Sequence, residues 1–511
     1  MSNPGLRAHR RRTIIVPALG LCVASFAGVA QAEALSAEGA VSRAARENPS
    51  LRAALLDAAA AQHAARAEKG ARDPNLVASV QGEHSENISR PGLSGGQGID
   101  GAASRSIGNS IDANAALRYT TDIGTELELG TAAGTSWNRT TWSGASPLPE
   151  NLQIGPTYTA QAYLSARQPL LRGAGRDSQL APLRQAESAA RAAESRRELD
   201  ASQTALDVLS AYWELWYADR AVLVQEQALG VAQRLSSDAK LRANTLGTGS
   251  EVDVLQFSTS AASIADALSQ ARAARTTRAI ELGRVLGLAP AQSAALEAVS
   301  DPPELGPAPA IDGLTRELRA TSPELAALRS DLERAQSRAA VARDADRPRV
   351  DLFATASVGT LWDDSADFSL SGGRPTYGVV GGVELELPLG SGRYSEDAAR
   401  ARAELAAAEA RYQAEVDALS ASVSSLGVNL DAAREQVELT TQTAATAGKL
   451  AEAERQRALL GTTTSQNVVT AEQTLREAEL RRLRALVSQL STRFELEHST
   501  GKLLDRFAAV L

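Results

Sequence analysis

The stretch Gln168–Gly173 reads QPLLRG, and the related stretch Leu387–Gly390 reads LPLG. Before each stretch, apolar residues alternate with polar ones, as in a β-strand that has one apolar face. After each stretch, proline becomes rare and Ala, Leu, Arg, Glu and Gln dominate, which is typical of a long helix. The chain therefore changes from strand to helix at two related points, and this pattern predicts an internal duplication.

Matching prolines and glycines extend both copies. Pro49 and Pro74 correspond to Pro323 and Pro348 at one constant offset, and the LGTG motif around Gly247 corresponds to LGTT around Gly461. Each half is therefore predicted to contain a helix, a strand region and a long helical hairpin that turns at a Gly-Thr pair. The predicted division is an export signal at 1–32; a first repeat at 33–305, with strands at about 76–168 and a hairpin at about 170–290; and a second repeat at 306–511, with strands at about 349–387 and a hairpin at about 390–505.

The predicted helices are too long for an ordinary globular core. No proline lies between Pro182 and Pro290 or after Pro388. Apolar residues recur at heptad spacing in two seams, one at Leu206, Leu209, Trp213 and Trp216, the other at Leu483, Leu486, Leu490 and Phe494. A narrow apolar stripe on a long helix indicates a coiled coil or a wall of helices. The aromatic group around Trp213 is interpreted as packing between helices rather than as a ligand site.

The strand regions carry the alternation that is typical of transmembrane barrel strands, about ten residues long, with long polar loops on one side and tight turns on the other. The alternative is a soluble sheet with one wet face. The expected strands are Leu76–Ser85, Thr157–Gln168, Arg349–Leu361 and Thr376–Leu387, together with an inserted pair at Asp112–Thr121 and Gly124–Trp137.

Four to six strands leave open edges, which lipid does not tolerate because every backbone group must be paired. Several copies of the chain are therefore expected to pool their strands into one barrel.

The first 32 residues have the pattern of an export signal: a basic head, an apolar stretch from Thr13 to Val29, and a small-x-small site that ends at Ala32. Cleavage there predicts Glu33 as the first residue of the exported protein, which N-terminal sequencing would test. Cys22 leaves a lipoprotein as the alternative, but bulky Leu21 precedes it where a small residue is expected.

The composition excludes several classes of function. Cys22 is the only cysteine, so the exported chain has no disulfide framework and no thiol nucleophile. The formal charge of −8 includes four arginines within residues 1–32, and it opposes nucleic-acid binding. The histidines are scattered, and the sequence contains no phosphate-binding loop and no metal-binding cluster. We expect neither an enzyme nor a resident cofactor or metal.

The duplicated order of these motifs, with Gln168–Gly173 and the two Gly-Thr turns, resembles the TolC family of outer-membrane factors over essentially the whole exported chain. The resemblance implies a mainly α fold with a transmembrane β-barrel. Three subunits share one barrel in the lipid of the outer membrane, and their duplicated hairpins form a tunnel across the periplasm. Four strands per chain give twelve, the family norm, and the inserted pair would raise this to eighteen. A periplasmic adaptor and an inner-membrane transporter are the implied partners.

The hairpin tips carry the implied gate. Gly247 and Gly461 are expected to end one helix of each hairpin. Family members carry acidic residues six and nine positions after such a glycine. Asp253 matches in the first half, but Asn467 and Thr470 occupy both places in the second, which puts an acidic ring there in doubt. Because Ser250–Asp253 is also a capping-box pattern, Asp253 has a purely structural alternative.

The predicted function is a passive exit duct of a tripartite efflux pump or a type I secretion system. The alternative is a periplasmic adaptor or a structural coiled-coil protein of the envelope. Adaptors have one hairpin flanked by small β-domains, whereas two hairpins and alternating strands favour the duct.

Overall fold

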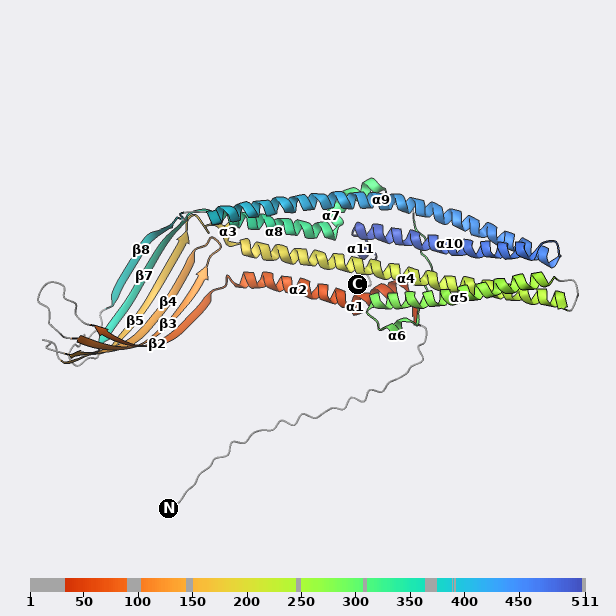
Figure 1. Cartoon of the computed structure of the whole chain (residues 1–511). Helices are drawn as coiled ribbons and strands as arrows, with labels where there is room; N and C mark the ends of the chain where they lie inside the picture. Colours follow the sequence, from red (N-terminus) through yellow and green to blue (C-terminus); the bar gives the residue numbers. More distant parts are fainter. Residues whose placement is uncertain are drawn as a thin grey trace, which may run out of the picture.

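The structure is a computed structural model that describes residues 33–89, 103–143, 150–244, 250–306, 310–363, 375–387, 389 and 392–507. It is elongated, with a β-sheet at one end, two long helical hairpins that extend to the other end, and a cluster of short elements midway (Figure 1). The predicted export signal and its cleavage site at Ala32 lie outside the described residues. None of the described helices is apolar over a length sufficient to cross a membrane.

Six strands form one antiparallel sheet, in the order β2-β3-β4-β5-β7-β8. Their bounds are β2 Asn75–Ser89, β3 Ala103–Thr120, β4 Glu126–Ser143, β5 Asn151–Pro169, β7 Arg349–Asp363 and β8 Thr376–Glu386. The inserted pair, β3 and β4, lies inside the sheet, and β5 of the first repeat pairs with β7 of the second. Strands β2 to β5 are longer than predicted because polar residues continue the alternation beyond the apolar part.

The two repeats build the helices in parallel. The first supplies α1 Ala37–Glu47, α2 Pro49–Gly70, α3 Arg176–Gln179, α4 Ala181–Asn244, α5 Glu251–Leu286 and α6 Pro290–Ser293. The second supplies α7 Ile311–Thr321, α8 Pro323–Ala345, α9 Gly392–Leu459, α10 Ser465–Ser499 and α11 Leu503–Phe507. At about 1.5 Å per residue, α4 and α9 each span about 100 Å.

The duplication is visible at the helix ends. Asn48 caps α2 and Ser322 caps α8, each just before a proline. Gly287 and Gly501 follow the long hairpins with φ of +82° and +75°, and a Cβ at either would meet backbone atoms just before Pro49 or Pro323. Glycine is required at both positions because it alone accepts this conformation and leaves room for the neighbouring chain.

The main core lies midway along the molecule. The two predicted heptad seams meet there, and Trp213 packs edge-on against both Tyr212 and Trp216. The short strands β1 Glu33–Leu35 and β6 Leu296–Ala298 pair in parallel beside them. The Tyr212 hydroxyl donates to the Leu35 carbonyl at 3.0 Å and accepts from the Ser300 amide at 2.9 Å. The aromatic group is thus packing between helices, as predicted.

Candidate functional site

The start of α5 and the start of α10, one from each hairpin, lie next to each other at the end of the molecule opposite the sheet (Figure 1). Gly247 lies outside the described residues, so the first turn is defined by the start of α5. Ser250 caps this helix, because its hydroxyl accepts from the Val252 amide at 3.2 Å. In the second turn, Gly461 follows α9 with φ of +73°, the left-handed conformation expected of a glycine at a helix C-terminus.

Asp253 lies in the first turn of α5, but its carboxylate contacts the second hairpin. The Ser465 hydroxyl, at the start of α10, donates to Asp253 Oδ1 at 2.5 Å. Gln256, one helical turn further along α5, contacts the same hydroxyl. Asp253 therefore links the two hairpins of one chain. Its negative charge also suits its position in the first turn of α5.

A second contact also joins the two hairpins near the tips. The Arg242 guanidinium, at the end of α4, donates to the Ala458 carbonyl of α9 at 3.1 Å. Glu454 is nearly buried and accepts from the Thr463 hydroxyl at 2.5 Å. This hydrogen bond, with a smaller contribution from Arg457, holds the pKa of Glu454 below its usual value. The second turn is thereby fixed from within.

Asn467 and Thr470 are exposed, one turn apart on α10. The Asn467 amide group donates to Thr463 Oγ1 at 3.2 Å, and the Thr470 hydroxyl accepts from Gln466 at 3.4 Å. Because both side chains are neutral, these two positions of α10 carry no charge.

A groove of about 400 Å³ runs between α4, α5 and α10 just behind the tips. Glu472 lies in it, and Arg455 Nε is 2.6 Å from its carboxylate. Burial raises the pKa of Glu472, and Arg455 opposes that shift. Sequence reasoning missed Ser465, Arg242 and Glu472. Nothing local distinguishes them from the many other polar residues of the helices. The partners of Ser465 and Arg242 lie in the other hairpin, and that of Glu472 lies on the opposite helix of the same hairpin.

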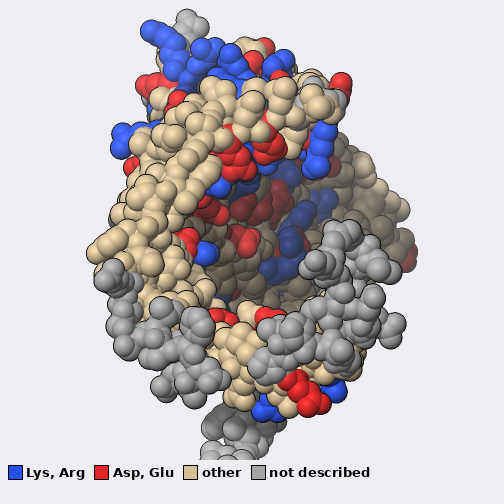
Figure 2. Space-filling model, turned by 90° about the vertical axis from the view of Figure 1, so that its left-hand side faces the viewer, with Lys and Arg blue, Asp and Glu red and all other residues tan. Residues whose placement is uncertain are grey.

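The sheet separates polar from apolar side chains by strand parity. On β8, Val379, Val383 and Leu385 point to the convex face, whereas Glu384 and Glu386 point to the concave face. Figure 2 looks into the concave side and shows acidic and basic side chains gathered inside it. A row of aromatic residues closes the convex apolar band near the outer ends of the strands: Trp137, Tyr158, Trp362 and Tyr377.

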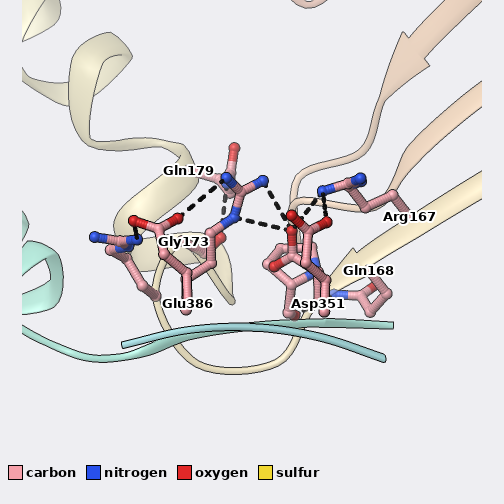
Figure 3. A network of polar contacts seen from close by, with 10 residues as sticks. Arg167, Gln168, Gly173, Gln179, Asp351 and Glu386 are labelled. Carbon is pink, nitrogen blue, oxygen red and sulfur yellow. Dashed lines mark hydrogen bonds and ion pairs between the residues drawn. The ribbon is translucent and has the colours of Figure 1, made fainter. Parts of the chain in front are cut away.

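A network of ion pairs joins the sheet to the helices at the QPLLRG stretch (Figure 3). Arg167 Nη1 lies 3.0 Å from Asp351 Oδ2 and 2.9 Å from Glu384. Arg349 also donates to Asp351 Oδ2, at 2.9 Å, and Arg172 lies 2.9 Å from Glu386. These contacts bind β5 of the first repeat to β7 and β8 of the second, just where the strands give way to helices.

The turn after Arg172 is held from the second repeat as well. Asp344, near the end of α8, accepts from the Gly173 amide at 2.7 Å and from the Ser178 hydroxyl at 2.8 Å. Within the turn, the Gln179 side chain donates to the Gly173 carbonyl at 2.7 Å. The described residues contain no group of side chains that could hold a metal ion.

The sequence and the fold were compared with known proteins. The outer membrane efflux protein family matches residues 314–502. Among solved structures, the outer membrane protein VceC of Vibrio cholerae is 18% identical with a TM-score of 0.63, over 91% of this chain and 96% of that one. The CmeC outer membrane channel of Campylobacter jejuni is 14% identical with a TM-score of 0.64, over 99% and 98%. The outer-membrane channel OprN is 15% identical with a TM-score of 0.64, over 91% and 90%.

The sequence has no match among curated proteins. The family match and the shared fold confirm the predicted resemblance and the predicted fold class of duplicated helical hairpins joined to barrel-type strands. The predicted role of an outer-membrane exit duct agrees with both findings.

Proposed function

We propose that this chain, whose residues 314–502 belong to the outer membrane efflux protein family, forms a passive exit duct across the periplasm and the outer membrane. One observation carries the proposal: a sheet with an apolar convex face and a charged concave face continues directly into hairpins about 100 Å long. The convex face suits lipid, the concave face suits water, and the helices extend the same path away from the membrane.

The duct requires more than one chain because the sheet is open. Strands β2 and β8 are its edges, and their side chains are strongly exposed, as at Leu76 (75%) and Val379 (84%). Since neighbouring strands alternate in direction across the six-stranded sheet, β2 and β8 run antiparallel to each other. The β8 edge of one copy can therefore pair with the β2 edge of the next in a closed ring without edges.

Three copies would close such a ring with eighteen strands. Twelve strands, the number favoured by the family norm, would require the inserted pair to lie outside the wall. Instead, β3 and β4 lie within the sheet, paired along most of their length with β2 and β5. Barrel width grows roughly linearly with strand number, so the insertion widens the exit.

The tips form the gate in this proposal. The Asp253–Ser465 and Arg242–Ala458 contacts hold the two hairpins of each chain together, and the neutral Asn467 and Thr470 line the approach. A periplasmic adaptor that docks at the tips, and an inner-membrane transporter behind it, would supply cargo and energy. Opening then requires the two hairpins to separate, which breaks these contacts in all three chains.

Two measurements test the proposal on the full chain purified from outer membranes. The mass of the detergent-solubilised particle should correspond to three chains, and the particle should form ion-conducting pores in a planar bilayer. A monomeric particle would contradict the shared barrel. If the protein is not recovered with the outer-membrane fraction and forms no pores, the result would support the periplasmic adaptor or coiled-coil alternative.

A further inference from the structure

The charged side chains of the sheet are distributed unevenly between its two faces. Among the strand side chains that the structure describes, the register places seven acidic residues on the concave face, namely Glu83, Asp112, Glu126, Glu128, Asp351, Glu384 and Glu386. The same face carries three basic residues, Arg118, Arg167 and Arg349. The convex face carries Glu86, Arg105 and Arg139 near its outer end. Among these described strand side chains, the acidic charges exceed the basic ones by four per chain, seven minus three.

The arginines neutralise only part of this set. Arg167 and Arg349 share Asp351, and Arg118 lies 3.1 Å from Glu128. Arg167 also pairs with Glu384, and Arg172, just after β5, pairs with Glu386. Within the described part of the chain, Glu83 and Glu126 form no ion pair. By strand register both lie on the concave face of the sheet. Figure 2 shows the hollow on this side. Their charge is therefore available to whatever passes through the interior.

The negative charge of Asp351 is also only partly compensated, although two arginines contact this carboxylate. Both arginines contact Oδ2 of Asp351, whose side chain is 2% exposed. Among the described atoms, Asp351 Oδ1 is buried and has no hydrogen-bond partner. A buried carboxylate oxygen is costly to leave unpaired, so this position favours a water molecule or a cation beside it.

We infer that the acidic interior of the sheet makes the exit prefer cations, so that cationic cargo passes more readily than anionic cargo. This inference rests on the proposed duct, and it places the charge filter in the strand region instead of at the tips. Rings of carboxylates in a pore raise the local concentration of cations and oppose anions. Three copies would contribute twelve excess acidic charges, three times four, while Asn467 and Thr470 contribute none.

The test is the reversal potential of single pores in a planar bilayer under a KCl gradient. The wild-type trimer should show a potential of the sign that marks K⁺ over Cl⁻. Glu83→Gln and Glu126→Gln together should shift that potential toward zero. The matched control is Glu86→Gln on the convex face, three residues from Glu83 on the same strand, which should leave the potential unchanged.

The outcomes separate the inference from the proposed function. Absence of pores from wild-type trimers would contradict the duct itself. Pores that prefer Cl⁻, or that keep the wild-type potential in the double variant, would overturn the inference and leave the duct in place. If the double variant assembles poorly, Arg118→Gln provides the opposite change. The inference requires a stronger cation preference in that variant, and a weaker one would overturn it.

Discussion

Tyr212 shows how one hydroxyl group can hold the middle of the molecule together. It bridges the Leu35 carbonyl and the Ser300 amide, which lie near the two ends of the first repeat. In Tyr212→Phe the Leu35 carbonyl keeps the Val299 amide as a donor, but the half-buried Ser300 amide loses the hydroxyl to which it donates, so we expect a loss of about 1–3 kcal/mol of stability. Thermal unfolding in detergent, followed by tryptophan fluorescence, measures it. Tyr217→Phe is the control, since its hydroxyl forms no hydrogen bond within the described part of the chain, and an equal loss there would contradict the assignment.

Asp253 is the residue on which the gate proposal can be tested most directly. Asp253→Ala and Ser465→Ala each remove the 2.5 Å link between hairpins. A part-buried hydrogen bond of this kind contributes about 1 kcal/mol, and in the proposed trimer three copies act together on one gate. We expect each variant to raise the conductance of folded trimers in a planar bilayer, and the double variant to add little more.

The structural alternative for Asp253 makes a different prediction. If Asp253 serves only its own helix, Asp253→Ala should cost up to about 1 kcal/mol of stability with unchanged conductance. Ser465→Ala should then have no effect on conductance either. If both variants conduct like the wild type, Asp253 has no gating role, and Arg242 and Glu454 become the next candidates for holding the gate.

At the scale of elements, both helices of the second hairpin are followed by a glycine with a left-handed backbone, Gly461 after α9 and Gly501 after α10. At Gly501, a Cβ would lie 2.3 Å from the Thr321 carbonyl, and φ is +75°. At Gly461, φ is similar at +73°, but a Cβ would meet no atom within 4 Å. Gly461→Ala should therefore cost about 1–2 kcal/mol for the left-handed backbone alone, and Gly501→Ala clearly more. The comparison of the two melting temperatures isolates the steric part, and equal losses would contradict it.

The contact between α4 and α10 makes stability depend on pH. His498 accepts or donates a hydrogen bond with the Ser202 hydroxyl at 2.8 Å. Burial lowers the pKa of His498, and Asp207 partly opposes that shift. Because the folded state binds this proton less well than the unfolded state, the stabilisation is present above the usual pKa of about 6.5 and is lost as the pH falls toward the lowered value.

The corresponding experiment uses two histidines of the same chain. His498→Gln should reduce the drop in melting temperature between about pH 7.5 and about pH 5.5. His63→Gln, at an exposed position of α2, should leave that drop unchanged. A drop of wild-type size in His498→Gln would show that other groups carry the pH dependence.

At the scale of the whole molecule, the inserted strand pair would set the width of the exit in the proposed barrel. Removal of residues 103–143 deletes β3 and β4 and leaves β2 beside β5. These two strands are antiparallel to each other, so they can pair directly and leave four strands per chain. We expect a trimer that still forms pores but conducts less, because a barrel of twelve strands is narrower than one of eighteen. Unchanged conductance would show that the pair does not belong to the wall.

The sequence by itself determined the duplication, the type of each element and the chemistry of each strand face. Periodicity, proline spacing and capping residues are local properties, so Pro49 and Pro323 predicted two related repeats and the heptads predicted long paired helices. Gly461 was placed correctly at a helix end for the same reason. The strand alternation predicted an apolar and a polar face for each strand. Only the outer, polar parts of β2 to β5 lay beyond the predicted strands.

Only the tertiary structure decided which distant residues meet. Asp253 and Ser465 are 212 residues apart, and Arg167 and Asp351 are 184 apart, so no local pattern links them. The position of β3 and β4 inside the sheet was open for the same reason, since a strand's own residues do not choose its neighbours. The alternation of positions along each strand indicated which residues share a face. Only the curvature of the sheet showed that the seven acidic side chains lie on its concave side. Long-range contacts are fixed by how complete elements pack, and that packing is a property of the whole chain.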